Sequence, residues 1–216
     1  MKILLVDDHA VVRQGYASLL RTLLPDVQVR EACDGEQALQ MVQDEIPNLV
    51  IMDISLPGIS GLETTRRLRQ RLPQLRVLFF SMHDELPLVR QALDAGALGY
   101  LTKTSSPEVL VEAVSRTLAG HPYIEQTLAT HLACNPHSEG SNDPRLRGMT
   151  QREFEIFVML AKGTPNQMIA EKLCISSKTV SNYLTLLKSK LQVSSQAELV
   201  HLAIDTGVIR LGLESA

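Results

Sequence analysis

The sequence predicts an α/β domain, a doubly wound five-stranded parallel sheet, followed by a small all-α domain. Apolar runs alternate with amphipathic stretches from residue 2 to about residue 118, and such βα repeats build a parallel sheet with right-handed crossovers. After residue 147, every segment has the apolar spacing that is typical of helices. A length of 216 residues is sufficient for two small domains.

Proline and glycine residues mark the boundaries of several expected helices and strands. Pro25 ends the first helix, Pro47 precedes the third strand, and Gly96 follows the fourth helix. The strands are expected near residues 2–6, 27–31, 48–52, 76–80 and 98–102. The helices are expected near residues 9–23, 35–44, 60–71, 85–95 and 106–119.

The chain is expected to divide into a domain over residues 1–119, a linker over residues 120–147 and a domain over residues 148–212. Between Asn135 and Pro144 the linker is polar and rich in turn-forming residues, and such a composition favours a flexible connection.

The second domain opens with a capping box, in which Thr150 is the N-cap and Glu153 stands three residues later. Its third expected helix has apolar residues at steps of four, three and four, namely Val180, Leu184, Leu187 and Leu191. The opposite face of that helix is small, polar and basic, as is typical of a helix that enters the major groove of DNA. That face carries Lys178, Ser181, Asn182, Thr185, Lys188 and Ser189.

The distribution of charge also separates two domains. Residues 1–144 carry 12 basic and 18 acidic side chains, whereas residues 145–216 carry 9 basic and 6 acidic side chains. A net charge of −6 on the first part and +3 on the second favours contact between the second part and an anionic polymer.

Composition excludes several other classes of protein. No apolar stretch approaches the roughly 20 residues that span a membrane, and Met1-Lys2-Ile3 leads directly into a strand, so no signal peptide is expected. An odd number of widely spaced cysteines forms neither a metal pattern nor a disulfide framework, which favours a reducing cytoplasm. These cysteines are Cys33, Cys134 and Cys174.

Polar side chains follow the buried strands at the edge where parallel strands bring their carboxyl ends together. They are Asp7, Asp8, Asp53, Ser81 and Lys103. Three converging carboxylates repel one another, so a cation, a proton or an ammonium group must offset their charge. The pattern predicts a Mg²⁺ site with an ammonium group beside it, which is suited to handling a phosphoryl group.

The first domain resembles a CheY-like receiver, which implies a flavodoxin-like fold. The matching residues are Asp7-Asp8-His9, Asp53, Leu56-Pro57-Gly58, Ser81 and Gly99-Tyr100-Leu101-Thr102-Lys103. The second domain resembles a LuxR-type helix-turn-helix domain. It matches through Met149-Thr150-Gln151-Arg152-Glu153, Asn166-Gln167-Met168-Ile169-Ala170, Leu173-Cys174-Ile175-Ser176 and Lys178-Thr179-Val180. Together the two domains resemble a two-component response regulator of the NarL/FixJ type, over nearly the whole chain except the linker.

For the receiver, the resemblance implies that Asp53 accepts a phosphoryl group from a sensor histidine kinase. Asp8 and Asp53, with the backbone carbonyl of Ser55, would ligate Mg²⁺, and Asp7 would act through a bound water. Lys103 would pair with Asp53 and then with the phosphoryl oxygens. Ser81 and Tyr100 would form the switch that changes the surface of the receiver.

Two neighbouring positions carry a further hypothesis. Ser55 stands two residues after Asp53, and His83 stands two residues after Ser81. In receivers such positions lie beside the phosphoryl group and affect its lifetime, although both residues also suit solvated loops.

For the second domain, the resemblance implies base contacts by Ser181, Asn182 and Thr185 and phosphate contacts by Lys178, Thr179, Lys188 and Lys190. The sequence departs from many relatives at Ser181-Asn182-Tyr183, where basic residues or histidine are frequent, so the resemblance implies the fold but not the DNA sequence preference. The last expected helix implies a homodimer, with Val200 and Ala203 as contact residues.

The expected function is therefore phosphorylation-controlled, sequence-specific binding to double-stranded DNA, in the cytoplasm and without enzymatic output. A DNA-binding regulator that does not depend on phosphorylation is the alternative. A phosphatase, or a receiver joined to a catalytic domain, is disfavoured because no catalytic motif follows residue 120. A nucleophile of the haloacid dehalogenase type is also disfavoured, because that pattern needs an aspartate where Ser55 stands.

Overall fold

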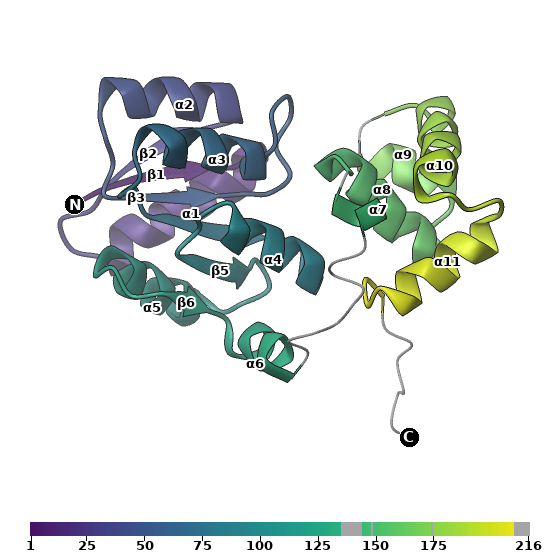
Figure 1. Ribbon diagram of the computed structural model, residues 1–216. Helices are drawn as coiled ribbons and strands as arrows, with labels where there is room; N and C mark the ends of the chain where they lie inside the picture. Colours follow the sequence, from purple (N-terminus) through teal and green to yellow (C-terminus); the bar gives the residue numbers. More distant parts are fainter. Residues whose placement is uncertain (135–143, 148, 174, 210–216) are drawn as a thin grey trace. The chain divides into compact units, whose positions relative to one another are not determined.

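The computed structural model describes residues 1–134, 144–147, 149–173 and 175–209. It contains two compact units, the first of which ends at Ala133. The first unit is an α/β domain and the second is all-helical (Figure 1). In the described part of the chain, no helix combines the length and the apolar character needed to cross a membrane.

All the strands of the first unit lie in one parallel sheet with the order β2-β1-β3-β4-β5-β6. The central strands are buried along their whole length, which explains why they are continuous apolar runs rather than alternating patterns. The bounds are β1 Lys2–Val6, β2 Gln28–Ala32, β3 Leu49–Met52, β4 Val77–Ser81, β5 Gly99–Thr102 and β6 Tyr123–Ile124.

The sheet has six strands, so the prediction of five was wrong by one edge strand. β6 pairs with β5 through Gly99 opposite Tyr123 and Tyr100 opposite Ile124. A strand of two residues is too short to show a recognisable hydrophobic periodicity in the sequence, and β6 is defined as a strand by its hydrogen bonds to β5. Gly99 permits this pairing, because a Cβ atom there would lie 2.6 Å from the carbonyl oxygen of Tyr123.

Helices cover both faces of the sheet. One face is packed by α1 and α5, whose buried Leu20 and Val114 belong to the same apolar cluster as Ile3 and Phe80 of the strands. α2 and α3 contact each other, and α2 also contacts β1 and β2. The bounds are α1 Ala10–Leu23, α2 Gly35–Asp44, α3 Gly61–Arg71, α4 Leu86–Asp94 and α5 Pro107–Leu118.

The segment expected to be a linker is ordered at both ends. After β6, residues Gln126–Cys134 form α6, which is anchored by buried Leu128, and residues Pro144–Arg147 form α7. The first unit ends at Ala133 and therefore extends 14 residues beyond the expected boundary at 119. The turn-rich centre of the expected linker, residues 135–143, lies outside the described residues.

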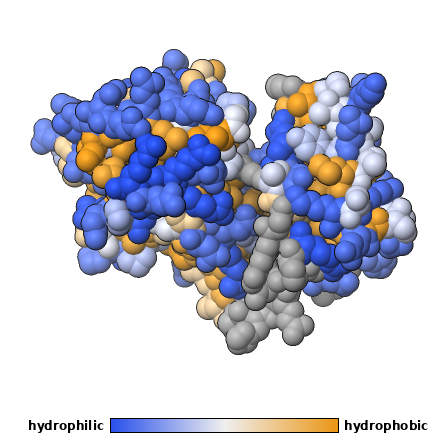
Figure 2. Space-filling view, turned by 45° about the horizontal axis from the view of Figure 1, so that its top comes forward, coloured by the Kyte–Doolittle hydropathy of each residue, from blue (hydrophilic) through white to orange (hydrophobic). Residues whose placement is uncertain are grey.

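The second unit is built around α8 Gln151–Ala161, α9 Asn166–Lys172, α10 Ser177–Leu191 and α11 Gln196–Asp205. Its capping box is present at Thr150 and Glu153. The turn residue Cys174 and the expected domain limits at 148 and 210–212 lie outside the described residues. The core includes Phe154, Phe157, Ile169, Val180, Leu187, Leu191 and Leu199. On the face drawn in Figure 2, each unit has a mostly hydrophilic surface interrupted by smaller apolar areas.

Candidate functional site

The sheet order brings the expected phosphoryl-transfer residues to one edge. Asp7 follows β1, Asp53 follows β3, Ser81 ends β4 and Lys103 follows β5, and these four strands are neighbours in the sheet. Backbone hydrogen bonds fix two of the positions. The Asp53 N–H donates to the carbonyl of Val6 at 2.9 Å, and the Lys103 N–H donates to the carbonyl of Ser81 at 2.7 Å.

Lys103 lies between two carboxylates. Its Nζ donates to Asp7 Oδ2 at 2.7 Å and to Asp53 Oδ2 at 2.6 Å. The side chains of the three residues are 6%, 2% and 5% exposed, so water screens these interactions weakly. The ammonium group therefore offsets the repulsion that two buried carboxylates would otherwise have.

Burial changes the proton affinity of both partners. It raises the pKa of the Asp53 carboxyl above its ordinary value, and the ion pair with Lys103 opposes that rise. Burial alone would lower the pKa of Lys103, but Asp53 and Asp7 outweigh it and hold the pKa above its ordinary value. Lys103 therefore stays protonated at neutral pH and carries the positive charge that a phosphoryl group needs.

Asp8 has a different environment from its neighbour Asp7. Its side chain is 32% exposed, and its Oδ1 lies 2.7 Å from Nδ1 of His9. Possible ligand atoms of Asp7, Asp8 and His9 lie within 4.8 Å of one another, and Asp53 is joined to Asp7 through Lys103. Carboxylate oxygens are the ligands that Mg²⁺ prefers. The carboxylates of Asp7 and Asp8 therefore fit this ion, whereas the His9 nitrogen does not add to its preferred donor set, and the group within 4.8 Å does not include Asp53.

Ser55 and His83 contact each other beside Asp53. Ser55 Oγ lies 3.1 Å from His83 Nε2, and the Ser55 N–H donates to Asp53 Oδ1 at 3.4 Å. The His83 N–H donates to Ser81 Oγ at 3.4 Å. The two side chains therefore contact each other beside Asp53, and both are half-buried residues of loops.

Tyr100 points into the unit. Its side chain is fully buried, its ring packs against Phe79 with 6.2 Å between centroids, and its hydroxyl donates to the carbonyl of His83 at 2.7 Å. Ser81 is also fully buried. The structure thus has Tyr100 in the inward position that the expected switch requires of one of its states.

Three residues that support the site were not predicted. Arg13 Nη1 donates to the carbonyl of Asp7 at 2.6 Å, and the hydroxyl of Tyr16 donates to the carbonyl of Lys103 at 3.3 Å. Glu125 accepts hydrogen bonds from Thr102. Arg13 and Tyr16 lie one turn apart on a helix that follows an aspartate pair, which is a weak signal. Glu125 has no local sequence signal at all.

The polar face of α10 carries the expected base-contacting residues, and they are exposed. The hydroxyl groups of Ser181 and Thr185 donate to carbonyls one turn earlier, at 3.0 and 3.1 Å, which leaves their oxygens able to accept hydrogen bonds. Asn182 and Lys178 are also exposed. Thr179 is half-buried, and its Oγ1 lies 2.8 Å from Oγ of the N-cap Ser176.

The two lysines at the end of α10 differ in their surroundings. Lys190 Nζ donates to Glu153 Oε2 at 2.7 Å, while the same carboxylate accepts from the Thr150 N–H. Burial opposes ionisation of Glu153, but the hydrogen bonds from Lys190 and Thr150 and the charge of Lys190 together outweigh it, so the pKa of Glu153 lies below its ordinary value. In this structure Lys190 therefore holds α10 to the start of α8 and does not point freely outward as a phosphate contact would.

One of the two expected dimer residues has another role. Ala203 is fully buried in the single chain and belongs to the core of the helical unit, together with Leu199. It cannot also cover a partner, because a small core needs the inner face of α11 for itself. Val200 is half-buried and remains a candidate for the outer face.

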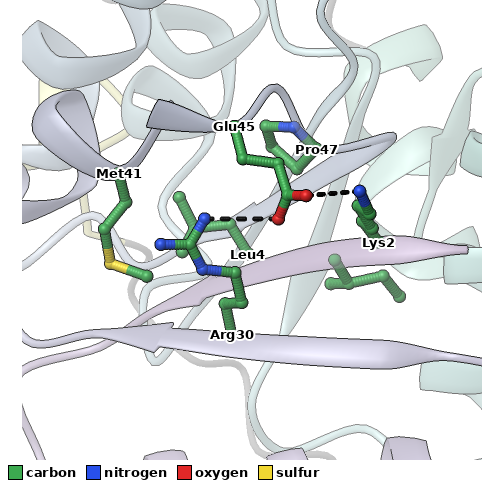
Figure 3. A pocket seen from close by; sticks show the side chains of 7 residues that line it. Lys2, Leu4, Arg30, Met41, Glu45 and Pro47 are labelled. Atoms are coloured by element: carbon green, nitrogen blue, oxygen red, sulfur yellow. Dashed lines mark hydrogen bonds and ion pairs between the residues drawn. The ribbon is translucent and has the colours of Figure 1, made fainter. Parts of the chain in front are cut away.

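A shallow hollow at the opposite edge of the sheet is not a second site. Figure 3 shows Glu45 between Lys2 and Arg30, and its carboxylate accepts hydrogen bonds from both side chains. The hydrogen bond from Lys2 holds the pKa of Glu45 below its ordinary value. The charges therefore satisfy one another, and the hollow lies near the start of β1, away from the strand ends where ligands bind in such sheets.

Comparisons with known proteins match both units. Residues 3–115 match the family model of the response regulator receiver domain, and residues 147–203 match that of the bacterial regulatory proteins of the luxR family. The chain is 69% identical over 212 residues to the transcriptional activator protein ExaE of Pseudomonas putida, covering 98% of this chain and 99% of that protein.

Two further relatives agree. The response regulator GacA of Pseudomonas aeruginosa is 35% identical over 209 residues, which cover 97% of this chain and 98% of that protein. A crystal structure of a two-component response regulator of the LuxR family from Aurantimonas sp. SI85-9A1 is 39% identical with a TM-score of 0.60. The match covers 62% of this chain and 96% of that one.

Proposed function

This chain belongs to the response regulators that join a receiver domain to a LuxR-type DNA-binding domain, and from this premise we propose that phosphorylation of Asp53 controls its binding to DNA. The observation that carries the proposal is the buried Lys103 ammonium group between Asp7 and Asp53. That arrangement presents a carboxylate nucleophile beside a fixed positive charge, which phosphoryl transfer requires.

The transfer is a displacement at phosphorus. A carboxylate oxygen of Asp53 forms the new P–O bond while the bond between phosphorus and the donor atom breaks, and an acyl phosphate results. A sensor histidine kinase would supply the phosphoryl group from a phosphohistidine. Lys103 first holds Asp53 and then pairs with the phosphoryl oxygens. Before transfer, Asp53 and Asp7 hold the pKa of Lys103 above its ordinary value.

Receiver domains in general bind Mg²⁺ in an acidic pocket, and here Asp8, Asp53 and the backbone carbonyl of Ser55 would hold the ion, with Asp7 acting through water. The bound ion would supply further positive charge against the phosphoryl oxygens. Lys103 cannot do this alone, because its single charge already faces two carboxylates.

The switch would act through Ser81 and Tyr100. Ser81 is buried at the end of β4, where its hydroxyl can turn towards a phosphoryl group on Asp53. The inward Tyr100 is bonded to His83, two residues after Ser81. A movement of this segment would therefore change the hydrogen bond that keeps the ring inside.

The output would be DNA binding by α10 as a homodimer. Ser181, Asn182 and Thr185 would contact bases, and Asn182 has the amide that pairs with adenine. Lys178, Thr179 and Lys188 would contact phosphates. Val200 is the remaining candidate on α11 for the dimer contact. The 69% identical relative is a transcriptional activator, and we extend activation of transcription, in the cytoplasm, to this chain.

The proposal is tested by treating the full chain with acetyl phosphate and Mg²⁺ and measuring its intact mass. The parent should gain one phosphoryl group, and Asp53→Asn should gain none because the amide is no nucleophile. Asp44→Asn is a matched control, since Asp44 is exposed at the end of α2. Equal phosphorylation of Asp53→Asn and the parent would refute the assignment of the acceptor.

A further inference from the structure

Glu125 lies outside the phosphorylation site but is bonded to the strand that carries Lys103. Its Oε2 accepts hydrogen bonds from the Thr102 N–H at 3.0 Å and from the Thr102 Oγ1 at 2.7 Å. Thr102 is the last residue of β5 and is 5% exposed. Lys103 follows it directly, so the carboxylate of Glu125 holds the residue next to the phosphate-binding lysine.

The pairing of β5 with β6 explains why a side chain is needed here. The Tyr123 N–H donates to the carbonyl of Leu98, and the Glu125 N–H donates to the carbonyl of Tyr100. If the regular hydrogen-bond pattern of two parallel strands continued by one more residue, the Thr102 N–H would donate to the backbone carbonyl of Glu125. That carbonyl instead accepts the Ala129 N–H at 2.8 Å, in the first turn of α6.

The carboxylate of Glu125 therefore replaces its own backbone carbonyl. The chain leaves the sheet after two residues of β6 to begin α6, and the buried Thr102 N–H would otherwise lose its acceptor. The hydroxyl of Thr102 donates to the same carboxylate of Glu125. Its oxygen also lies 2.9 Å from Thr104 Oγ1 and 3.2 Å from Ser105 Oγ. The loop after Lys103 is thus tied to the same carboxylate.

We propose that Glu125 is a positioning residue for Lys103, and that it ties the start of α6 to the phosphorylation site. Lys103 is fixed on one side by the carbonyl of Ser81 in β4. On the other side, the Glu125–Thr102 hydrogen bonds are its support. This inference rests on the proposed role of Lys103 in phosphoryl transfer.

The first test measures the position of Lys103 without any phosphorylation. The full chain is treated with an amine-reactive acetylating reagent, and the labelling rate of Lys103 is followed by peptide mass spectrometry. Glu125→Ala should raise the rate several-fold, because a freed loop exposes the buried amine. Glu125→Gln should stay near the parent, since its amide oxygen can accept both hydrogen bonds.

The control is Glu112→Ala, which removes an exposed carboxylate on α5 that pairs only with Arg116, at 3.4 Å, among the ion pairs of the described residues. Its Lys103 should react like that of the parent. If Glu125→Ala lowers the melting temperature but leaves the labelling rate of Lys103 at the control value, Glu125 merely stabilises the sheet edge and the inference is wrong. Should Glu125→Ala not fold, Glu125→Asp shortens the side chain by one methylene group and withdraws its carboxylate from Thr102, and an unchanged labelling rate in that variant would also overturn the inference.

The second measurement is the rate of phosphorylation of the same variants by acetyl phosphate and Mg²⁺. We expect a roughly tenfold loss in Glu125→Ala, below the roughly 100-fold cost of a 1 Å misplacement, and recovery in Glu125→Gln. A rate equal to that of Glu112→Ala would overturn the link to transfer. Failure of the parent itself to be phosphorylated would instead refute the proposed function, while the labelling result would still decide the position of Lys103.

Discussion

Lys103 is the single positive charge that makes two buried carboxylates tolerable. Both Asp7 and Asp53 bond to its Nζ, and all three side chains are nearly inaccessible to water. Removing one member of such a buried set leaves an uncompensated charge, which is more costly than never having buried the set. Removing Lys103 should therefore destabilise the folded protein, because two buried carboxylates would repel each other, and this effect does not depend on phosphoryl transfer.

Lys103→Ala should lower the free energy of unfolding by about 3–5 kcal/mol, the cost of breaking a buried ion pair. Replacing Asp53 by Asn in the same chain should recover part of that loss, because one unpaired charge is then removed. Urea unfolding of the two single variants and the double variant measures this coupling. Additive losses would contradict the assigned pairing.

Ser55 and His83 form one contact, so they should act as a unit on the lifetime of the phosphoryl group. We expect Ser55→Ala and His83→Ala to shorten the lifetime by a similar factor, because each opens the same side of Asp53 to water. The double variant should be no faster than either single variant. Decay of phosphorylated protein after removal of the donor gives the rates, and lifetimes equal to that of the parent would eliminate this role.

Glu153 joins two helices of the DNA-binding domain through one carboxylate. It completes the capping box of α8 and accepts the Lys190 hydrogen bond from α10. Its pKa is lowered in the folded state, so its contribution to stability is complete above its ordinary pKa of 4.5 and is lost as the pH falls through the lower, folded-state value.

Glu153→Gln should therefore lower the melting temperature of the DNA-binding domain at neutral pH, and the loss should shrink progressively below pH 4.5. The expected cost at neutral pH is about 1.5–3 kcal/mol, the range for a hydrogen bond to a charged group. Thermal unfolding of the full chain at several pH values tests this. Asp205→Asn, at an exposed acidic residue of the same domain, serves as a comparison. A loss that stays constant with pH would be incompatible with the ion pair.

Substitutions of the two lysines at the end of α10 should have different effects on DNA binding. Lys188→Ala should weaken binding to all sequences and lower the salt dependence by about one counterion. Lys190→Ala should leave that slope unchanged and lower stability, because its partner is Glu153. Titrations of labelled DNA at several salt concentrations give both slopes. Equal changes in the two variants would show that Lys190 leaves Glu153 to reach phosphate.

The long elements were predictable because each has its own pattern. Buried strands such as β3 and β4 are continuous apolar runs, and α8 has a capping box. β6 was missed because its two residues become a strand only through Gly99 and the strand beside it. Sequence spacing also could not separate the core face of α11 from its outer face, so Ala203 was assigned to the wrong one.

The phosphorylation site shows the same division between local and distant determinants. The order of Asp7, Asp53, Ser81 and Lys103 along successive strands was sufficient to predict that they converge, because parallel strands align their carboxyl ends. The contact between Ser55 and His83 and the role of Glu125 depend on side-chain directions across strands. No periodicity in the sequence contains that information.

At the level of the entire chain, chemistry and recognition are assigned to different domains with opposite net charge. The acidic first domain handles the phosphoryl group, and the basic second domain carries the exposed polar face of α10. Phosphorylation adds negative charge at a site that is already acidic, so its effect on DNA binding must be transmitted by a change in the receiver and not by direct attraction to DNA.

Control of DNA binding by Asp53 can be measured by mapping bound DNA across the genome with Asp53 intact and with Asp53→Asn at equal protein levels. We expect the substitution to remove occupancy at most bound promoters under inducing conditions, while the exposed Asp44→Asn variant retains it. The same set of sites at the same occupancy in all three strains would instead identify a regulator that binds DNA without phosphorylation.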